Sequence, residues 1–166
     1  GHKIKRFLGN GKKLGVNIKY INEKMPLGTA GSLYLLKKFN KPLIVSNADI
    51  ISNIDFQELI NYHKKLKSII TVSAINISEK NRYGKIIFKK NKLLKIVEKK
   101  ENKNLINAGI YVVSPKIKGF LKKKEYKNMT DLISKVVKKN NKVHIFPIYE
   151  RWLDYGLKKN IKRHYY

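Results

Sequence analysis

Acidic residues are scarce in this chain, so the places where they occur are the first candidates for chemistry. Asp and Glu number 11 against 38 Lys and Arg in 166 residues. Asp49 follows the apolar run "LIVSNA", and Asp154 lies in "RWLDYG" between aromatic residues and a glycine. The carboxyl end of a strand is the edge where open α/β sheets bind ligands. Two carboxylates there would suit Mg²⁺, although either one alone could equally be a turn or cap residue.

Small residues gather in a second stretch, "MPLGTAGSLY", which spans residues 25–34. Glycine and other small residues allow a tight turn before a helix, and they also allow a ligand to contact the backbone closely. These residues alone leave both alternatives open.

Three weaker signals accompany these two. Asn107 and Gly109 interrupt an apolar strand, and a strand glycine often marks a bulge or a close approach by a ligand. The sequence "EKK" at 98–100 indicates little, because Glu-Lys pairs are common on exposed strands. The four histidines lack the spacing of metal ligands, so we interpret them as surface or packing residues. The chain has no cysteine, which excludes disulfides and thiolate metal sites.

The elements that would position these residues alternate between strands and helices, which is typical of a layered α/β domain. Several strands are continuous apolar runs, as in strands buried on both faces of a mostly parallel sheet. Strands are predicted at 16–21, 42–47, 69–77, 105–114 and 143–149, with a hairpin of 83–90 and 92–99 joined at Asn91. Helices are predicted at 30–39, with Thr29 as N-cap, at 55–67, capped by Asp55, and at 129–140. We expect one domain over residues 1–166.

The formal net charge of +27 first suggests a polyanion-binding module. Positive charge is spread along the whole chain, and Lys greatly outnumbers Arg, as a strongly AT-rich codon bias would produce. A recognition surface usually concentrates its charge and includes Arg for bidentate contacts. We therefore favour a solvated surface that binds polyanions without specificity, and we expect no specific nucleic-acid partner.

Nothing in the sequence indicates a membrane partner. No apolar run approaches the roughly 20 residues that span a bilayer, and "GHKIKRFLGN" has no apolar core of the signal-peptide type. We expect a soluble, cytoplasmic protein. The N-terminus also lacks Met, so we expect a fragment or a processed chain.

Six motifs follow one another along the chain, and together they are more specific than any one of them. The series is "EKMPLGTAGSL", "IVSNADI", "YGKI", "IVEKK", "NAGIYVVSP" and "WLDYG". Over nearly its whole length the chain resembles the sugar-1-phosphate nucleotidyltransferase family, in the branch of mannose-1-phosphate guanylyltransferases and glucose-1-phosphate thymidylyltransferases. The resemblance implies a Rossmann-like three-layer α/β/α nucleotide-diphospho-sugar transferase fold with a mostly parallel mixed sheet. It also implies Mg²⁺ as cofactor, with a nucleoside triphosphate and a sugar 1-phosphate as substrates.

The resemblance also implies residue roles. The metal would be held by Asp49 and Asp154, which with Lys99 would form the catalytic set. The nucleotide site would be lined by Leu27, Gly28 and Thr29. The sugar phosphate would be faced by Gly84, Glu98, Lys99 and Asn107.

Two departures from the family pattern limit this reading. The opening strand and glycine-rich loop of the form G-G-x-G-T-R, which grips the triphosphate, is absent from the sequence. We therefore expect the chain to begin inside the domain, and we expect this chain alone to be inactive. The usual E-K-P is Glu98-Lys99-Lys100 here, and Ala48-Asp49 stands where many members have G-D. A non-catalytic sugar-nucleotide-binding relic or regulatory fragment and a basic polyanion-binding module remain alternatives, and a homo-oligomer is equally open.

Overall fold

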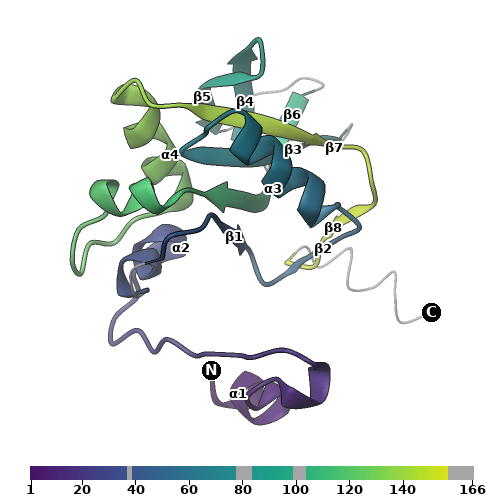
Figure 1. Cartoon of the computed structure of the whole chain (residues 1–166), viewed down its shortest axis with the longest axis vertical. Coiled ribbons are helices and arrows are strands. Elements are labelled where there is room, and N and C mark those ends of the chain that lie inside the picture. The colour runs from purple at the N-terminus through teal and green to yellow at the C-terminus, as the bar shows by residue number, and fades with distance from the viewer. Residues whose placement is uncertain (37–38, 78–83, 99–103, 157–166) are drawn as a thin grey trace.

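The computed structural model describes residues 1–36, 39–77, 84–98 and 104–156 (Figure 1). The main sheet is formed by β1 (Leu43–Ser46), β3 (Ile70–Ile77), β4 (Gly84–Lys89), β5 (Lys92–Glu98), β6 (Asn104–Val113) and β7 (Val143–Ile148). A two-stranded sheet is formed by β2 (Ile50–Ser52) and β8 (Trp152–Asp154). The α-helices are α1 (His2–Leu8), α2 (Gly28–Gly31), α3 (Phe56–Lys65) and α4 (Met129–Lys138), and the 3₁₀ helices are η1 (Lys12–Leu14), η2 (Ser32–Leu35) and η3 (Pro115–Phe120).

Helices cover both faces of the main sheet, so the predicted three-layer α/β/α fold is confirmed (Figure 1). On one face, Leu59 of α3 packs in a cluster with Ile110 and Val112 of β6. On the other face, α4, α2 and η3 pack in a cluster that includes Tyr111 of β6. Neighbouring residues of β6 therefore enter opposite cores, as the two-residue period of a strand requires.

Strand direction differs from the prediction. The sheet order is β1-β6-β3-β7-β5-β4. Strands β1, β3 and β7 share one direction, because β1 and β3 are both antiparallel to β6 and β3 is parallel to β7. The mixed sheet is confirmed, but β3–β7 is the only parallel ladder among the described residues, so "mostly parallel" is corrected. A continuous apolar run indicates only that a strand is buried on both faces. Helices that cover both faces of a sheet bury its strands in this way whether neighbouring strands are parallel or antiparallel.

The predicted strand at 16–21 does not form. These residues are described without a regular element, and Val16 and Ile21 are exposed. A strand needs a neighbour to receive its backbone hydrogen bonds, and no described strand lies beside this segment. Helix α1, at the purple end of the chain, lies apart from the main sheet and buries none of its residues (Figure 1).

The helix predicted at 30–39 is shorter than expected and begins earlier. Helix α2 starts at Gly28 and continues as η2, and Leu36 is already extended. Thr29 therefore lies inside α2 and is not its N-cap. The predicted burial of β1 is also wrong in part, since β1 is the end strand of the described sheet and Ile44 is exposed.

The other predicted elements agree closely with their expected ranges, whereas α1, η1, β2, η3 and β8 have no counterpart in the prediction. Asp55 caps α3 as predicted, because its Oδ1 accepts hydrogen bonds from the backbone N–H groups of Gln57 and Glu58. Strands β4 and β5 form the predicted hairpin, and its turn residues Lys90 and Asn91 both have positive φ. Within the described part of the chain, no helix has the length and apolarity needed to cross a membrane.

Candidate functional site

The structure places the two singled-out carboxylates side by side. A Cβ atom added to Gly156 would lie 2.8 Å from Asp49 Oδ2 and 3.0 Å from Asp154 Oδ1. The two oxygens therefore lie no farther apart than the sum of these distances, and a side chain at residue 156 would fill the space beside them. The two residues that the family resemblance implies as metal ligands thus lie together, and their metal role stays a prediction.

Backbone hydrogen bonds hold the two acidic segments together, although these segments lie far apart in the sequence. Strands β2 and β8 are antiparallel, and Ile50 is paired with Asp154 in their register. Beyond this pair, the N–H of Tyr155 donates to the carbonyl of Asp49 at 2.8 Å. The N–H of Gly156 donates to Asp154 Oδ1 at 2.8 Å, which orients that carboxylate. The turn after β8 thus joins residues more than a hundred positions apart in the sequence.

The donor set fits Mg²⁺ better than a metal that needs an all-protein cage. Among the described residues there is no group of three or more His, Cys, Asp and Glu side chains that could hold a metal ion. Two neighbouring carboxylates are what Mg²⁺ commonly takes from a protein, because it keeps several water molecules and binds substrate phosphates. Asp49 is exposed and Asp154 is half-buried, so solvent can reach the pair.

The small-residue loop, residues 27–31, packs against the segment that leads into α4. A Cβ atom on Gly28, which has φ +75°, would lie 2.7 Å from the carbonyl oxygen of Lys127. A Cβ atom on Gly31 would lie 2.6 Å from the carbonyl oxygen of Glu125. Real Cβ atoms do not approach backbone that closely, so both glycines are required by this packing.

Hydrogen bonds join the same two segments. The carbonyl of Leu27 accepts from the N–H of Lys127 at 2.9 Å, and the carbonyl of Lys127 accepts from the N–H of Ala30 at 2.9 Å. Thr29 Oγ1 accepts from the N–H of Met129 at 2.9 Å, so it satisfies the first N–H of α4, whose N-cap residue is Asn128. The structure thus explains the small residues by packing, and a nucleotide-binding role for Leu27, Gly28 and Thr29 stays a prediction.

The residues predicted for the sugar phosphate are described only in part. Gly84 and Glu98 are directly paired in the register of β4 and β5. Lys99 lies outside the described residues. Asn107 is half-buried, where its Nδ2 donates to the Tyr111 hydroxyl at 2.6 Å and its Oδ1 accepts from the N–H of Gly109 at 3.1 Å. Burial raises the pKa of Tyr111, so the phenol stays protonated.

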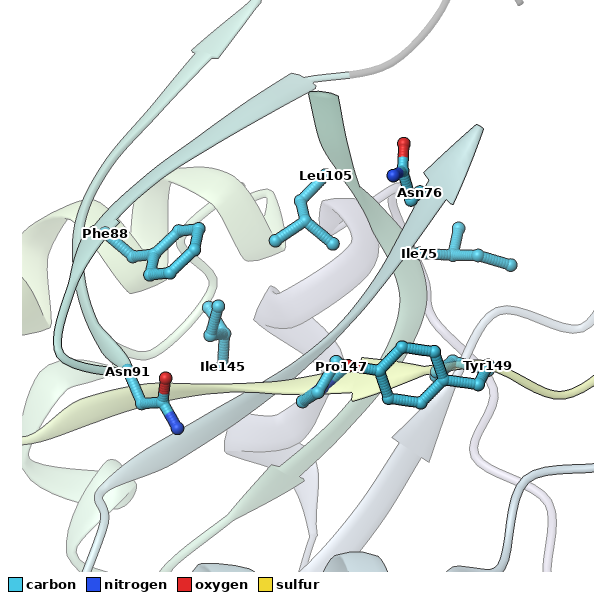
Figure 2. Close-up of a pocket in the computed structure, with 9 residues that line it drawn as sticks. Ile75, Asn76, Phe88, Asn91, Leu105, Ile145, Pro147 and Tyr149 are labelled. Atoms are coloured by element: carbon cyan, nitrogen blue, oxygen red, sulfur yellow. The ribbon is translucent and has the colours of Figure 1, made fainter. Parts of the chain in front are cut away.

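A separate cavity of about 480 Å³ opens between β7 and the β4–β5 hairpin. Figure 2 shows Phe88 and Asn91 of the hairpin on one side and Ile145, Pro147 and Tyr149 on the other. The hairpin is paired with β7 at one described position, Lys92 with His144. This ladder ends before Pro147, so the missing N–H of the proline costs no hydrogen bond to the hairpin. Among the residues that the structure describes, none with a charged side chain lines this cavity.

Sequence reasoning missed three residues that shape the site: Asn47, Trp152 and Gly156. All three lie inside the quoted motifs or directly beside them, within two residues of a carboxylate. Their signal was only their closeness to Asp49 and Asp154, since an asparagine, a tryptophan and a glycine have no spacing that reveals a contact between distant segments.

Comparisons with known proteins agree with the motif series. A family model described as nucleotidyl transferase matches residues 1–163. Mannose-1-phosphate guanyltransferase 2 of Candida glabrata is 34% identical over 158 residues, covering 90% of this chain and 44% of that relative. The mannose-1-phosphate guanyltransferase of Yarrowia lipolytica is 40% identical over 114 residues, covering 64% of this chain and 31% of the relative. The chain therefore spans less than half the length of these curated relatives.

Solved structures share the fold. A protein assigned as a glucose-1-phosphate thymidylyltransferase of Bacillus anthracis, in complex with sucrose, matches with a TM-score of 0.83 and 23% identity, covering 98% of this chain and 69% of that one. The HddC protein of Yersinia pseudotuberculosis complexed with GMP-PN matches with a TM-score of 0.79 and 21% identity, covering 98% and 72%. At these identities the likeness shows the fold alone.

Proposed function

The chain belongs to the nucleotidyl transferase family, and from this premise we propose that the protein transfers a nucleotidyl group from a nucleoside triphosphate to a sugar 1-phosphate. The observation that carries the proposal is the pair Asp49 and Asp154, whose carboxylates converge beside Gly156. The pair lies just beyond the carboxyl end of β1, where α/β sheets bind nucleotides and phosphates.

The proposed reaction needs no protein nucleophile. An oxygen of the sugar 1-phosphate attacks the α-phosphorus of the triphosphate, and the bond from that phosphorus to the β-phosphate bridging oxygen breaks. The products are an NDP-sugar and pyrophosphate. Catalysis in such a transfer rests on holding two anions in line and neutralising the charge that develops.

Each group of residues has a role in this proposal. Asp49 and Asp154 would hold Mg²⁺, which supplies positive charge at the phosphates when it is bound. Lys99 would give a point charge to the sugar phosphate, and Glu98 would accept hydrogen bonds from sugar hydroxyls. Gly84 and Asn107 would complete the sugar side, and the backbone of residues 27–29 would contact the nucleotide.

The names of the relatives suggest which substrates to test first. Several are called mannose-1-phosphate guanyltransferases, so GTP and mannose 1-phosphate are the first pair. Glucose 1-phosphate with dTTP is the second pair, because of the Bacillus anthracis structure. Pyrophosphate release from both pairs, and from crossed pairs, identifies the base and the sugar separately.

The test compares the 166-residue chain with a version that carries a glycine-rich G-G-x-G-T-R segment and its strand upstream of Gly1. We expect Mg²⁺-dependent pyrophosphate release from the extended version. Asp154→Asn should lower the rate by at least about a hundredfold, because it removes one of two metal ligands. Glu58→Gln is the matched control, since it removes a carboxylate from exposed α3 and should leave the rate unchanged.

Two outcomes would oppose the proposal. A folded, extended chain that binds both substrates without releasing pyrophosphate would favour the non-catalytic alternative. Equal rates for Asp154→Asn and Glu58→Gln would remove Asp154 from the site.

A further inference from the structure

We infer that a bulge in β6, between Asn107 and Tyr111, positions the two carboxylates, and that Trp152 is the positioning residue that ties Asp154 to it. The inference rests on the proposed function, because it assumes that Asp49 and Asp154 share a metal ion. It adds residues whose hydrogen bonds and packing fix where the carboxylates lie.

The first tie runs from β8 to the bulge. Trp152 Nε1 donates to the carbonyl oxygen of Ala108 at 2.8 Å. Trp152 is also half-buried against the cluster that α3 forms with the sheet. Trp152 and Asp154 are two residues apart in one strand, so their side chains leave β8 on the same side. Anchoring the indole therefore limits the movement of Asp154.

The second tie runs from the segment after β1 to the next residue of the bulge. The N–H of Asn47 donates to the carbonyl oxygen of Gly109 at 2.9 Å. A Cβ atom on Gly109 would lie 2.8 Å from Asn47 Nδ2 and 3.3 Å from Ile50 Cγ1. Asp49 lies between Asn47 and Ile50 in the sequence, so residues on both sides of this carboxylate are packed against Gly109.

The bulge itself is held internally. The register of β3 with β6 shifts between Val72 and Ala74, and Gly109 has φ +73°, a conformation that favours glycine. Asn107 closes the bulge, because its Oδ1 accepts from the N–H of Gly109 while its Nδ2 binds Tyr111. β6 is paired with β1 from Ile110 onward and with β3 on either side of the register shift, so paired residues flank the bulge.

Two consecutive carbonyl oxygens thus accept the hydrogen bonds that hold the two acidic segments. That of Ala108 accepts from Trp152 of β8, and that of Gly109 accepts from Asn47 after β1. Outer groups that orient metal ligands commonly change metal affinity by tenfold to a hundredfold when they are removed. We therefore expect loss of the indole N–H to weaken metal binding even though the carboxylates remain.

The experiment measures Mn²⁺ binding to the 166-residue chain by water-proton relaxation, with Mn²⁺ as the probe for Mg²⁺. Trp152→Phe keeps an aromatic ring in the cluster but removes the donor to Ala108, and we expect about a tenfold loss of affinity. Tyr62→Phe is the matched control. Tyr62 packs against the same cluster and its hydroxyl accepts from Asn91, so the change removes one hydrogen bond away from the carboxylates and should leave affinity unchanged.

A second measurement is independent of metal. Trp152 is the only tryptophan, so its indole N–H gives one resonance in a ¹⁵N-labelled chain. We expect that proton to be protected from hydrogen exchange, and to lose its protection in Gly109→Ala, which disturbs the bulge. Cooperative unfolding of each variant shows that it is folded.

The outcomes separate the two proposals. If the unaltered chain binds Mn²⁺, Asp154→Asn abolishes that binding and Trp152→Phe leaves it unchanged, the positioning role is wrong and the metal site stands. An exchange-labile indole proton in the unaltered chain also overturns the positioning role. If the unaltered chain binds no Mn²⁺, both the metal role of the carboxylates and this inference fail.

Discussion

At the residue scale, the site depends on glycines because side chains from segments far apart in the sequence pack directly against their backbone. Gly109 lies against Asn47, and Gly156 lies between the two carboxylates. At each glycine, a neighbouring side chain occupies the space that a Cβ atom would fill. A larger residue would have to displace the side chains of Asn47 and Ile50 at Gly109, or the two carboxylates themselves at Gly156, so the glycines control geometry without offering a functional group.

Gly109→Ala should therefore destabilise the protein, while Gly119→Ala should not. Alanine at 109 would have to adopt φ +73° with its Cβ 2.8 Å from Asn47 Nδ2, whereas nothing lies within 4 Å of a Cβ at Gly119. We expect a loss of about 1–3 kcal/mol in the free energy of unfolding for Gly109→Ala and a change below about 1 kcal/mol for Gly119→Ala. Urea denaturation measures both, and equal losses would show that the bulge tolerates a side chain.

His63 is a buried residue whose state follows from its partners. It is 1% exposed. Its Nδ1 lies 2.9 Å from Thr71 Oγ1 and its Nε2 lies 3.0 Å from Ser114 Oγ. The Ser114 hydroxyl donates to the carbonyl of Ser68, so the proton between Ser114 and the ring belongs to Nε2, and Nδ1 accepts from Thr71. Burial, with a smaller effect of His144, lowers the pKa of His63 to about 4.

This pKa predicts a loss of stability in mild acid. The folded state keeps His63 neutral, whereas the unfolded chain takes up a proton near the ordinary pKa of about 6.5. The stabilisation is thus complete above about pH 6.5 and is lost as the pH falls toward about 4. Between about pH 7.5 and about pH 5 the chain should lose about 2 kcal/mol more than His63→Gln does. Urea denaturation of both proteins at the two pH values checks the sign, and parallel losses would contradict it.

At the element scale, the sequence predicts the elements whose signal is local. The buried positions of α4 are spaced as one helix face, Met129, Leu132, Ile133 and Val136, and α3 has its Asp55 cap. The β4–β5 hairpin has a short turn, in which Lys90 and Asn91 both have positive φ. Each of these features involves neighbours in sequence, so pattern and propensity are enough to reveal it.

Features that depend on distant neighbours could not be predicted. Residues 16–21 have strand composition but no partner strand in the described structure, and β2 and β8 are too short to show a pattern. β6 is antiparallel to both of its neighbours, β1 and β3, and an apolar run in the sequence does not indicate strand direction. For the site, the isolated carboxylates at 49 and 154 could be predicted, but Trp152 could not, because its partner Ala108 is 44 residues away.

Thr29 links two elements, and its role in stability is testable. Its Oγ1 accepts from the N–H of Met129 at the start of α4, so Thr29→Ala should cost about 1 kcal/mol of unfolding free energy. Thr29→Ser keeps the hydroxyl and should restore most of this. Urea denaturation gives both values. If Thr29→Ala is as stable as the unaltered chain, the hydroxyl does not stabilise the start of α4, and its presence in the loop would need another explanation, such as contact with the nucleotide.

At the scale of the whole molecule, the charge is the dominant property. A net charge of +27 on 166 residues creates a positive potential over much of the surface, which attracts any polyanion and also attracts triphosphates. The net charge does not alter the packing of the two cores, because the residues that fill them are apolar. The same charge thus serves the proposed substrates without defining a site for them.

We therefore expect DNA and heparin to bind weakly, without sequence preference, and through charge alone. Affinity should fall at least about a hundredfold between about 50 and about 200 mM salt, because each phosphate contact releases counterions. Two charge reversals at separate places test whether the attraction is spread out. Lys12→Glu with Lys13→Glu changes η1, and Lys122→Glu with Lys123→Glu changes the exposed segment after η3. Fluorescence polarisation with labelled duplexes should show similar small losses for both pairs. A large loss confined to one pair, or a sequence preference that survives high salt, would indicate a dedicated surface and favour the polyanion-binding module.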